Sequence, residues 1–125
     1  MGSRTRIATS VLGVLFALQG VHWIIDPARA AEGLGMPLLD GLARSTQVGD
    51  FAAFFLTLGA TIVIGARPGF ARLLLVPAGM LVVAASMRTL AWALHDAAFA
   101  TAFIAIEIAA SALLLAASRR LDANG

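Results

Sequence analysis

Three ionisable residues stand inside otherwise apolar stretches of this chain: Asp50, Arg88 and Glu107. An ionised side chain at bilayer depth is costly, so it normally faces the protein interior, pairs with an opposite charge and marks a functional site. Carboxyl groups exchange protons, and a guanidinium stabilises a developing oxyanion. The three residue types therefore predict acid/base catalysis, with Glu107 as the acid or hydrogen-bond donor, Arg88 as the oxyanion holder and Asp50 as the base.

The charges of these three residues do not balance, because two carboxylates face one arginine. We expect Arg88 to form a salt bridge with Asp50 or Glu107. Desolvation disfavours an ionised carboxyl, so one of the two is expected to stay protonated, and Glu107, the deeper, is the candidate. The alternative interpretation is a salt bridge that fixes the register of the helices and has no chemical role.

Six other polar or aromatic side chains are expected to contact a bound molecule near these three residues. They are Gln19, His22, Gln47, Trp92, His95 and Phe103. A haem or metal site built from His22, His95 and Asp50 is an alternative, but no ligand pair has the spacing typical of such sites. We therefore predict no cofactor and no metal. The chain has no cysteine, which excludes thiolate chemistry.

The composition indicates that membrane helices must position these side chains. The chain has 125 residues, of which 60% are hydrophobic and 13% charged, and its mean hydropathy is +0.90. Soluble domains are about half apolar and about one quarter charged. Four apolar stretches are each long enough for a hydrocarbon core of about 30 Å. The sequence predicts one all-α domain over residues 1–125, an integral membrane antiparallel four-helix bundle with helices at 6–25, 42–66, 70–94 and 97–118.

Several local signals refine this prediction. Asp26 and Pro27 predict a short interfacial helix over residues 26–33, between the first two long helices. The Arg67-Pro68-Gly69 sequence indicates a tight turn. Pro77 is expected to kink the third helix, and residues 121–125 are expected to be disordered. The first apolar run is too long for a secretory signal core and contains Gln19 and His22, so we expect it to remain as a helix.

All nine basic residues are arginines, and they cluster at the predicted membrane borders. Six of them fall on the side that carries both termini: Arg4, Arg6, Arg67, Arg72, Arg119 and Arg120. Lys/Arg bias predicts that this side is cytoplasmic, in a bacterial inner membrane. No loop has a basic run with interleaved aromatic residues, so nucleic acid is not an expected partner.

Alanines on the fourth helix recur at alternating steps of four and three, opposite Glu107. They are Ala98, Ala102, Ala105, Ala109, Ala112 and Ala116. Membrane helices approach closely along stripes of small residues, so this face predicts a homo-oligomer. On the first helix, Gly13, Ala17 and Gly20 repeat the pattern on the face opposite Gln19 and His22.

The order of these features resembles the small four-helix, DoxX-like bacterial membrane proteins, and most of all a domain-of-unknown-function group near them. The resemblance lies in GVHWIIDPARAAEGLGMP, ARSTQVGDF, SMRTLAWALHD and FIAIEIAASALLL, and covers nearly the whole chain. It places Arg44, Arg88, Asp96 and Glu107 at the group's characteristic positions. Gly49-Asp50 and Ala97 stand where the group has a Gly-Gly pair and a Gly. The resemblance implies a four-helix membrane fold and no particular reaction.

These observations predict a membrane-embedded pocket for a small lipophilic molecule, open to the outer half of the bilayer, with isomerase or hydrolase chemistry by proton transfer. One alternative is an accessory subunit whose buried charges only lock its helices together. Another is a proton-coupled carrier in which Glu107 cycles its proton. The expected partners are the lipid bilayer, the lipophilic molecule and further copies of the chain.

Overall fold

The computed structural model describes residues 2–124, which form an all-α fold with no strand in that range. The elements are α1 (Gly2–Ile25), α2 (Pro27–Gly33), α3 (Gly41–Gly65), the 3-10 helix η1 (Ala71–Leu74), α4 (Leu75–Leu94) and α5 (Thr101–Asn124). The all-α prediction and the four long helices are confirmed, together with the short helix between the first two.

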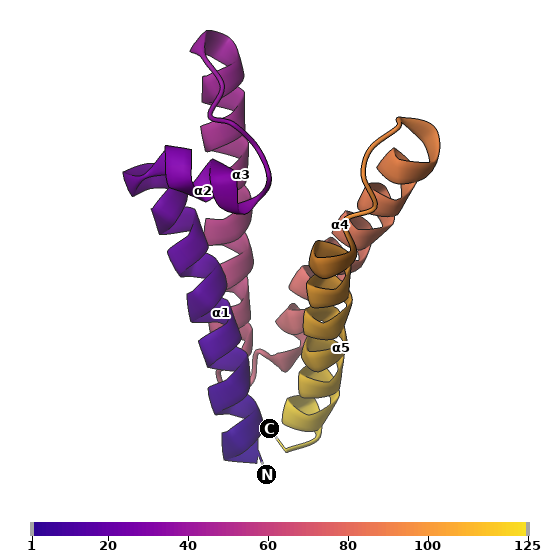
Figure 1. The fold of residues 1–125 in the computed structure, drawn as a ribbon. Helices are drawn as coiled ribbons and strands as arrows, with labels where there is room; N and C mark the ends of the chain where they lie inside the picture. The colour runs from indigo at the N-terminus through magenta and orange to yellow at the C-terminus, as the bar shows by residue number, and fades with distance from the viewer. Residues whose placement is uncertain (1, 125) are drawn as a thin grey trace.

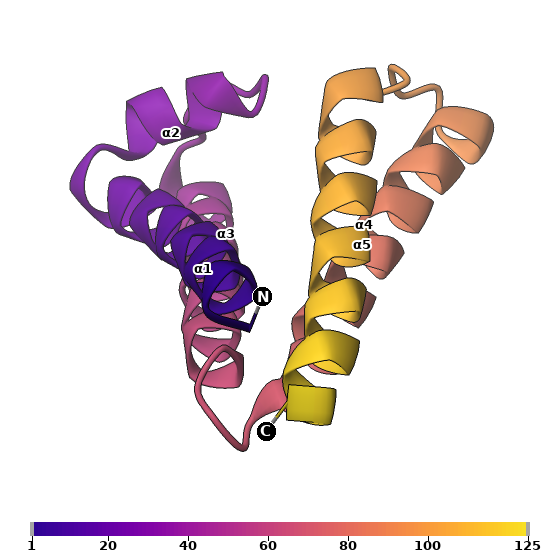
Figure 2. The same cartoon turned by 90° about the horizontal axis from the view of Figure 1, so that it is seen from below.

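The four long helices form two pairs, α1 with α3 and α4 with α5 (Figure 1). The pairs converge at the end that carries both termini and diverge toward α2 and the α4–α5 loop. The view from below shows the same separation of the two pairs (Figure 2). The fold is therefore a splayed bundle, closed at one end and open at the other.

Glycines bring α1 and α3 into close contact. A Cβ atom on Gly13 would lie 2.9 Å from the Gly59 carbonyl oxygen, and one on Gly20 would lie 2.8 Å from the Leu56 nitrogen. Gly13 and Gly20 are buried. The expectation that the small residues of the first helix form an outward face is therefore wrong, because α3 covers them within the same chain.

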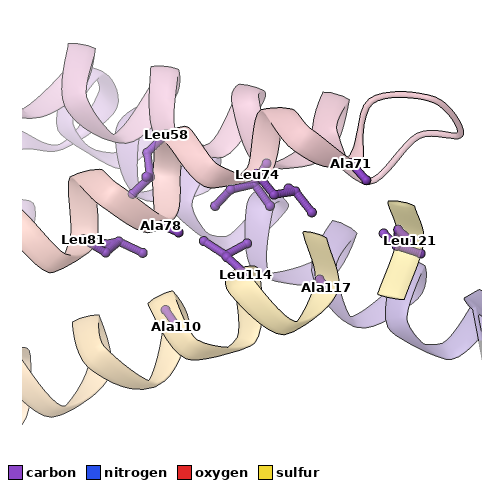
Figure 3. Packing of buried hydrophobic residues seen from close by; sticks show 10 residues of the cluster. Leu58, Ala71, Leu74, Ala78, Leu81, Ala110, Leu114, Ala117 and Leu121 are labelled. Atoms are coloured by element: carbon purple, nitrogen blue, oxygen red, sulfur yellow. The ribbon is translucent and has the colours of Figure 1, made fainter. Parts of the chain in front are cut away.

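A leucine-rich core joins the two pairs at the closed end (Figure 3). Leu58 on α3, Leu74 on η1 and Leu114 on α5 are all fully buried there. Leu121 is 3% exposed in the same core, and Asp122 pairs with Arg72 at 3.7 Å. The expected disordered tail is therefore wrong for residues 121–124, since the core holds them in α5, and Gly125 lies outside the described residues.

A hydrogen bond from an arginine side chain and a tight turn complete the closed end. The Arg6 Nε donates a hydrogen bond to the Ala66 carbonyl oxygen at 2.8 Å, which ties α1 to the last turn of α3. The Arg67-Pro68-Gly69 turn is present, and Gly69 has a φ of +85° that favours glycine. These contacts bring the first residues of α1 and the α3–η1 turn to one place.

The third long helix changes from 3-10 to α-helical geometry just before its proline. The chain forms η1 over Ala71–Leu74, and α4 begins at Leu75, two residues before Pro77. The amide positions of a first helical turn have no partner within the helix, so a proline there removes no hydrogen bond. The apolar pattern cannot distinguish this change of helix type from one continuous helix.

The fourth long helix starts four residues later than expected. Asp96 has a φ of +56° in the linker after α4, and α5 begins at Thr101. At the other open-end connection, Asp26 does cap α2, since its Oδ1 accepts a hydrogen bond from the Arg29 amide at 3.4 Å. Aspartate tolerates both a backbone with positive φ and the N-cap position of a helix. The residue type alone therefore does not distinguish the linker role of Asp96 from the capping role of Asp26.

Four helices of the described chain are long and apolar enough to cross a membrane: Gly2–Ile25, Gly41–Gly65, Ala71–Leu94 and Thr101–Ala123. Their surfaces carry many exposed large apolar side chains, as is typical of helices that face lipid. The protein is therefore a membrane protein. The five alanines of the predicted stripe that lie on α5 are exposed while Glu107 is buried, as expected, whereas Ala98 lies in the linker before α5. The homo-oligomer remains a prediction.

Candidate functional site

A cavity of about 960 Å³ lies between the two helix pairs. Residues of α1, α2 and α3 form one wall, and residues of α4 and α5 form the other. Most of its lining is apolar. The apolar residues include three leucines and three phenylalanines: Leu12, Leu15, Leu81, Phe16, Phe54 and Phe55. Residues of α2 contribute to its lining, so the cavity lies toward the end at which the two pairs diverge (Figure 1).

An ion pair between α4 and α5 supplies polar groups to this cavity. The Arg88 Nε donates a hydrogen bond to the Glu107 Oε1 at 2.9 Å. The Glu107 side chain is 12% exposed and the Arg88 side chain is 35% exposed. The Arg88 guanidinium also lies 4.8 Å from the centre of the Phe103 ring, a cation–π contact. The pair is therefore held from two directions, and its atoms remain accessible from the cavity.

The third predicted catalytic residue, Asp50, lines the same cavity from the other helix pair. It projects from α3 and forms no ion pair within residues 2–124. The carboxylate that receives the hydrogen bond of Arg88 is therefore Glu107. The structure thus places Asp50 and Glu107 on facing walls of one hollow.

Of the six predicted contact residues, Gln19, His22 and Phe103 line the cavity. Gln19 and His22 project from α1, three residues apart on one face of the helix. Phe103 lies one turn before Glu107 on α5. These three side chains therefore lie where the sequence predicted, around a shared hollow.

The other three predicted contact residues lie outside this cavity. The Gln47 side chain is hydrogen-bonded to the α2–α3 loop. Its Oε1 accepts a hydrogen bond from the Leu39 amide, and its Nε2 donates one to the Pro37 carbonyl oxygen. Trp92 is 52% exposed and packs edge-to-face on Phe99. His95 ends α4 and is exposed. The side chains of these three residues therefore do not line the cavity as expected.

The sequence did not indicate two features of the cavity. Arg29 on α2 reaches its lining, because α2 folds back over the open end. Phe54 and Phe55 form much of the α3 wall, and they contact each other with ring centres 5.2 Å apart. Phe54 follows Asp50 by four residues, a spacing that places both on one side of a helix and could have identified this wall.

A second cavity of about 580 Å³ lies beside the first, under the α2–α3 loop. Asp50 and Phe51 line both cavities. Phe51 also stacks on the fully buried Trp23, with ring centres 4.9 Å apart. Asp50 is therefore on the wall of both hollows.

Within residues 2–124, no group of three His, Asp or Glu side chains has the geometry to hold a metal ion. His22 lines the cavity and His95 lies outside it, so these two residues and Asp50 do not converge on one point.

Comparisons with known proteins found no matching family model, no matching curated protein and no matching solved structure. The fold and the site therefore define the class directly: an all-α membrane protein with four membrane-length helices and a partly polar cavity between two helix pairs.

Proposed function

We propose that this protein binds a small lipophilic molecule in the cavity between its two helix pairs. One observation carries the proposal: an aromatic-walled hollow of about 960 Å³ contains a few convergent polar groups, Arg88, Glu107 and Asp50 among them. Pockets for small molecules typically have about 300–1,000 Å³ and this mixture of apolar walls and few polar groups. The ligand's apolar body would contact the phenylalanines, and its polar group would reach the charged side chains.

The proposal includes acid/base conversion of that molecule. General acid and base groups must reach a substrate from different directions. Glu107 and Asp50 project from different helix pairs into one hollow, which supports the isomerase or hydrolase chemistry predicted from the residue types. Arg88 uses its Nε for Glu107, and its terminal nitrogens are the donors that would hold an oxyanion.

We further propose a bacterial inner membrane, with both termini in the cytoplasm. The support is the arginine-rich closed end, where Arg6 and Arg72 make their contacts and both chain ends lie. Basic residues concentrate on the cytoplasmic side of membrane proteins. In that orientation, the cavity lies in the outer half of the bilayer.

One observation favours the alternative of a purely structural role for the polar residues. The hydrogen bond of 2.9 Å between Arg88 and Glu107 ties α4 to α5. Breaking one side of a buried ion pair is strongly destabilising, whatever its function. A binding assay must therefore be separated from a stability assay.

The neutral dye Nile red, added to the purified protein in lipid nanodiscs, tests the proposal. Ala84 lines the cavity from α4, so Ala84→Trp should place an indole ring in the hollow and weaken the blue-shifted fluorescence of bound dye. The matched control is Ala93→Trp, at an exposed position of α4 outside the cavity lining, and it should bind normally. Equal dye binding by the two folded variants would refute the cavity as a binding site.

A second measurement separates binding from structure. We expect Arg88→Ala and Glu107→Gln to change the dye's affinity or emission in samples that remain folded by gel filtration. A lowered thermal stability with unaltered dye binding would instead assign the ion pair to the structural role.

A further inference from the structure

We propose that the ligand of this cavity is a lipophilic cation, recognised by Asp50 and by the phenylalanines of α3. This inference rests on the proposed binding function and specifies its substrate class. It depends on the charges around the cavity, the position of the aromatic rings and the absence of an ion-pair partner for the Asp50 carboxylate.

Five ionisable side chains line the cavity: His22, Arg29, Asp50, Arg88 and Glu107. Both arginines have an anionic partner, since Arg29 pairs with Asp26 at 3.6 Å and Arg88 pairs with Glu107 at 2.9 Å. Asp50 has neither an ion pair nor a side-chain hydrogen bond within residues 2–124, and none joins it to His22. With neutral histidine, the two arginines and two carboxylates of the lining balance, and Asp50 is the one of these four charges that has no ion-pair partner within residues 2–124.

The position of Asp50 makes this lack of a partner consequential. It is the tenth residue of α3, so about 13 Å of helix separates it from the open-end terminus of α3. Asp50 is exposed on the walls of the two hollows, within a helix of membrane length, where a charge is normally paired. A positively charged group on the ligand is the partner that the protein itself does not provide.

Aromatic rings line the same cavity as this carboxylate. Phe51 is adjacent to it, Phe54 lies one turn further along α3, and Phe55 stacks on Phe16 of α1 with ring centres 6.3 Å apart. The faces of aromatic rings attract cations, and sets of such rings recognise quaternary ammonium groups. Phe103 already contacts the Arg88 guanidinium, so the rings near Asp50 are the ones available for a ligand.

The two other ligand charges fit less well. An anionic ligand would add a third negative charge near Asp50 and Glu107, which is unfavourable. A neutral ligand would cover Asp50 with apolar surface and leave it without a counter-charge, which is unfavourable. Charge complementarity therefore selects a cation with an apolar body.

Three probes of similar shape test this inference: tetraphenylphosphonium, triphenylphosphine oxide and tetraphenylborate, which are cationic, neutral and anionic. Equilibrium dialysis would compare their binding to the full-length protein in zwitterionic nanodiscs, with empty nanodiscs subtracted. We expect the cation to bind at least about tenfold more tightly than the neutral probe, a difference of about 1.4 kcal/mol. The anion should bind most weakly.

The variants Asp50→Asn and Glu32→Gln form a matched pair, because each removes one carboxylate. Glu32 is exposed on α2 and does not line the cavity. Asp50→Asn should weaken cation binding at least about tenfold and leave the neutral probe unchanged, while Glu32→Gln should alter neither. Phe54→Leu, which keeps the Asp50 charge, should weaken cation binding a few-fold and serves as a second variant if Asp50→Asn does not fold.

The outcomes separate this inference from the function on which it rests. Binding that is weakened in Ala84→Trp but is equal for all three probes, or unaffected by Asp50→Asn and Phe54→Leu, would overturn the cationic ligand and leave the binding cavity intact. Binding of no probe and no Nile red would refute the binding function itself.

Discussion

The contact between α1 and α3 gives a sharp prediction about stability, because it depends on one glycine. An ideal Cβ on Gly59 would lie 2.5 Å from the Gly13 carbonyl oxygen and 2.7 Å from the Ala17 Cβ. Ordinary van der Waals contacts of a Cβ begin near 3.4 Å. The obstructing atoms belong to the backbone and to a Cβ, which cannot rotate away, so Gly59→Ala must push the two helices apart.

The expected magnitude follows from two opposing terms. Overpacking a core costs about 1–3 kcal/mol, and the rigid neighbours of Gly59 place this case near 3 kcal/mol. Alanine is more favourable than glycine within a helix by about 1 kcal/mol. The net loss in the free energy of unfolding should therefore be about 2 kcal/mol.

Gly79 provides the matched control, because it is exposed on α4 and nothing lies within 4 Å of its ideal Cβ. Gly79→Ala should stabilise the protein by about 1 kcal/mol, since only the helix-propensity term operates. Reversible unfolding in SDS–detergent mixtures, followed by circular dichroism, measures both changes. If the two variants unfold at the same SDS fraction, the close approach of α1 and α3 is not the contact that the structure indicates.

Two further predictions concern the ends of the bundle. Leu121→Ala should destabilise the protein by about 2–4 kcal/mol in the same SDS assay, because Leu121 is 3% exposed in the leucine core, whereas Ala123→Gly at an exposed position should cost about 1 kcal/mol or less. Gln47→Ala should cost about 1–3 kcal/mol and increase proteolysis of the α2–α3 loop, because the Leu39 amide and the Pro37 carbonyl oxygen lose their partner. A loop that is cleaved no faster than in the wild type would show that Gln47 does not hold it.

The apolar lengths and the turn residues were sufficient to predict the helices to within a few residues. Hydrophobic runs of membrane length report the existence of each helix, and Arg67-Pro68-Gly69 reports the turn between two of them. The C-terminal end was missed because only the tertiary core explains why Leu121 continues α5. Likewise, the 3-10 start before Pro77 depends on how η1 packs beneath α3 and α5, which no local pattern contains.

The candidate site could be predicted in part, for a physical reason. A charge such as Glu107 in an apolar helix must point inward, so its residue type and position determine where it faces. No such constraint applies to Trp92 or His95 near a helix end, where either direction is permitted by the solvent or the interface. The choice between Asp50 and Glu107 as partner of Arg88 depended on which helices pair, and the structure pairs α4 with α5.

The distribution of small, apolar and polar contacts explains why the hollow lies at the open end. Glycines hold α1 against α3 along their length, while the buried Ser111 hydroxyl donates to the Ala78 carbonyl oxygen and, with the Arg88–Glu107 pair, holds α4 against α5. Contacts between the pairs, by contrast, come chiefly from the leucine core near the termini. Each pair is thus rigid by itself, the pairs are joined at one end, and the charged side chains gather where no apolar layer joins them. A ligand in this hollow would complete the contact between the pairs, so its binding should also draw α3 and α5 together.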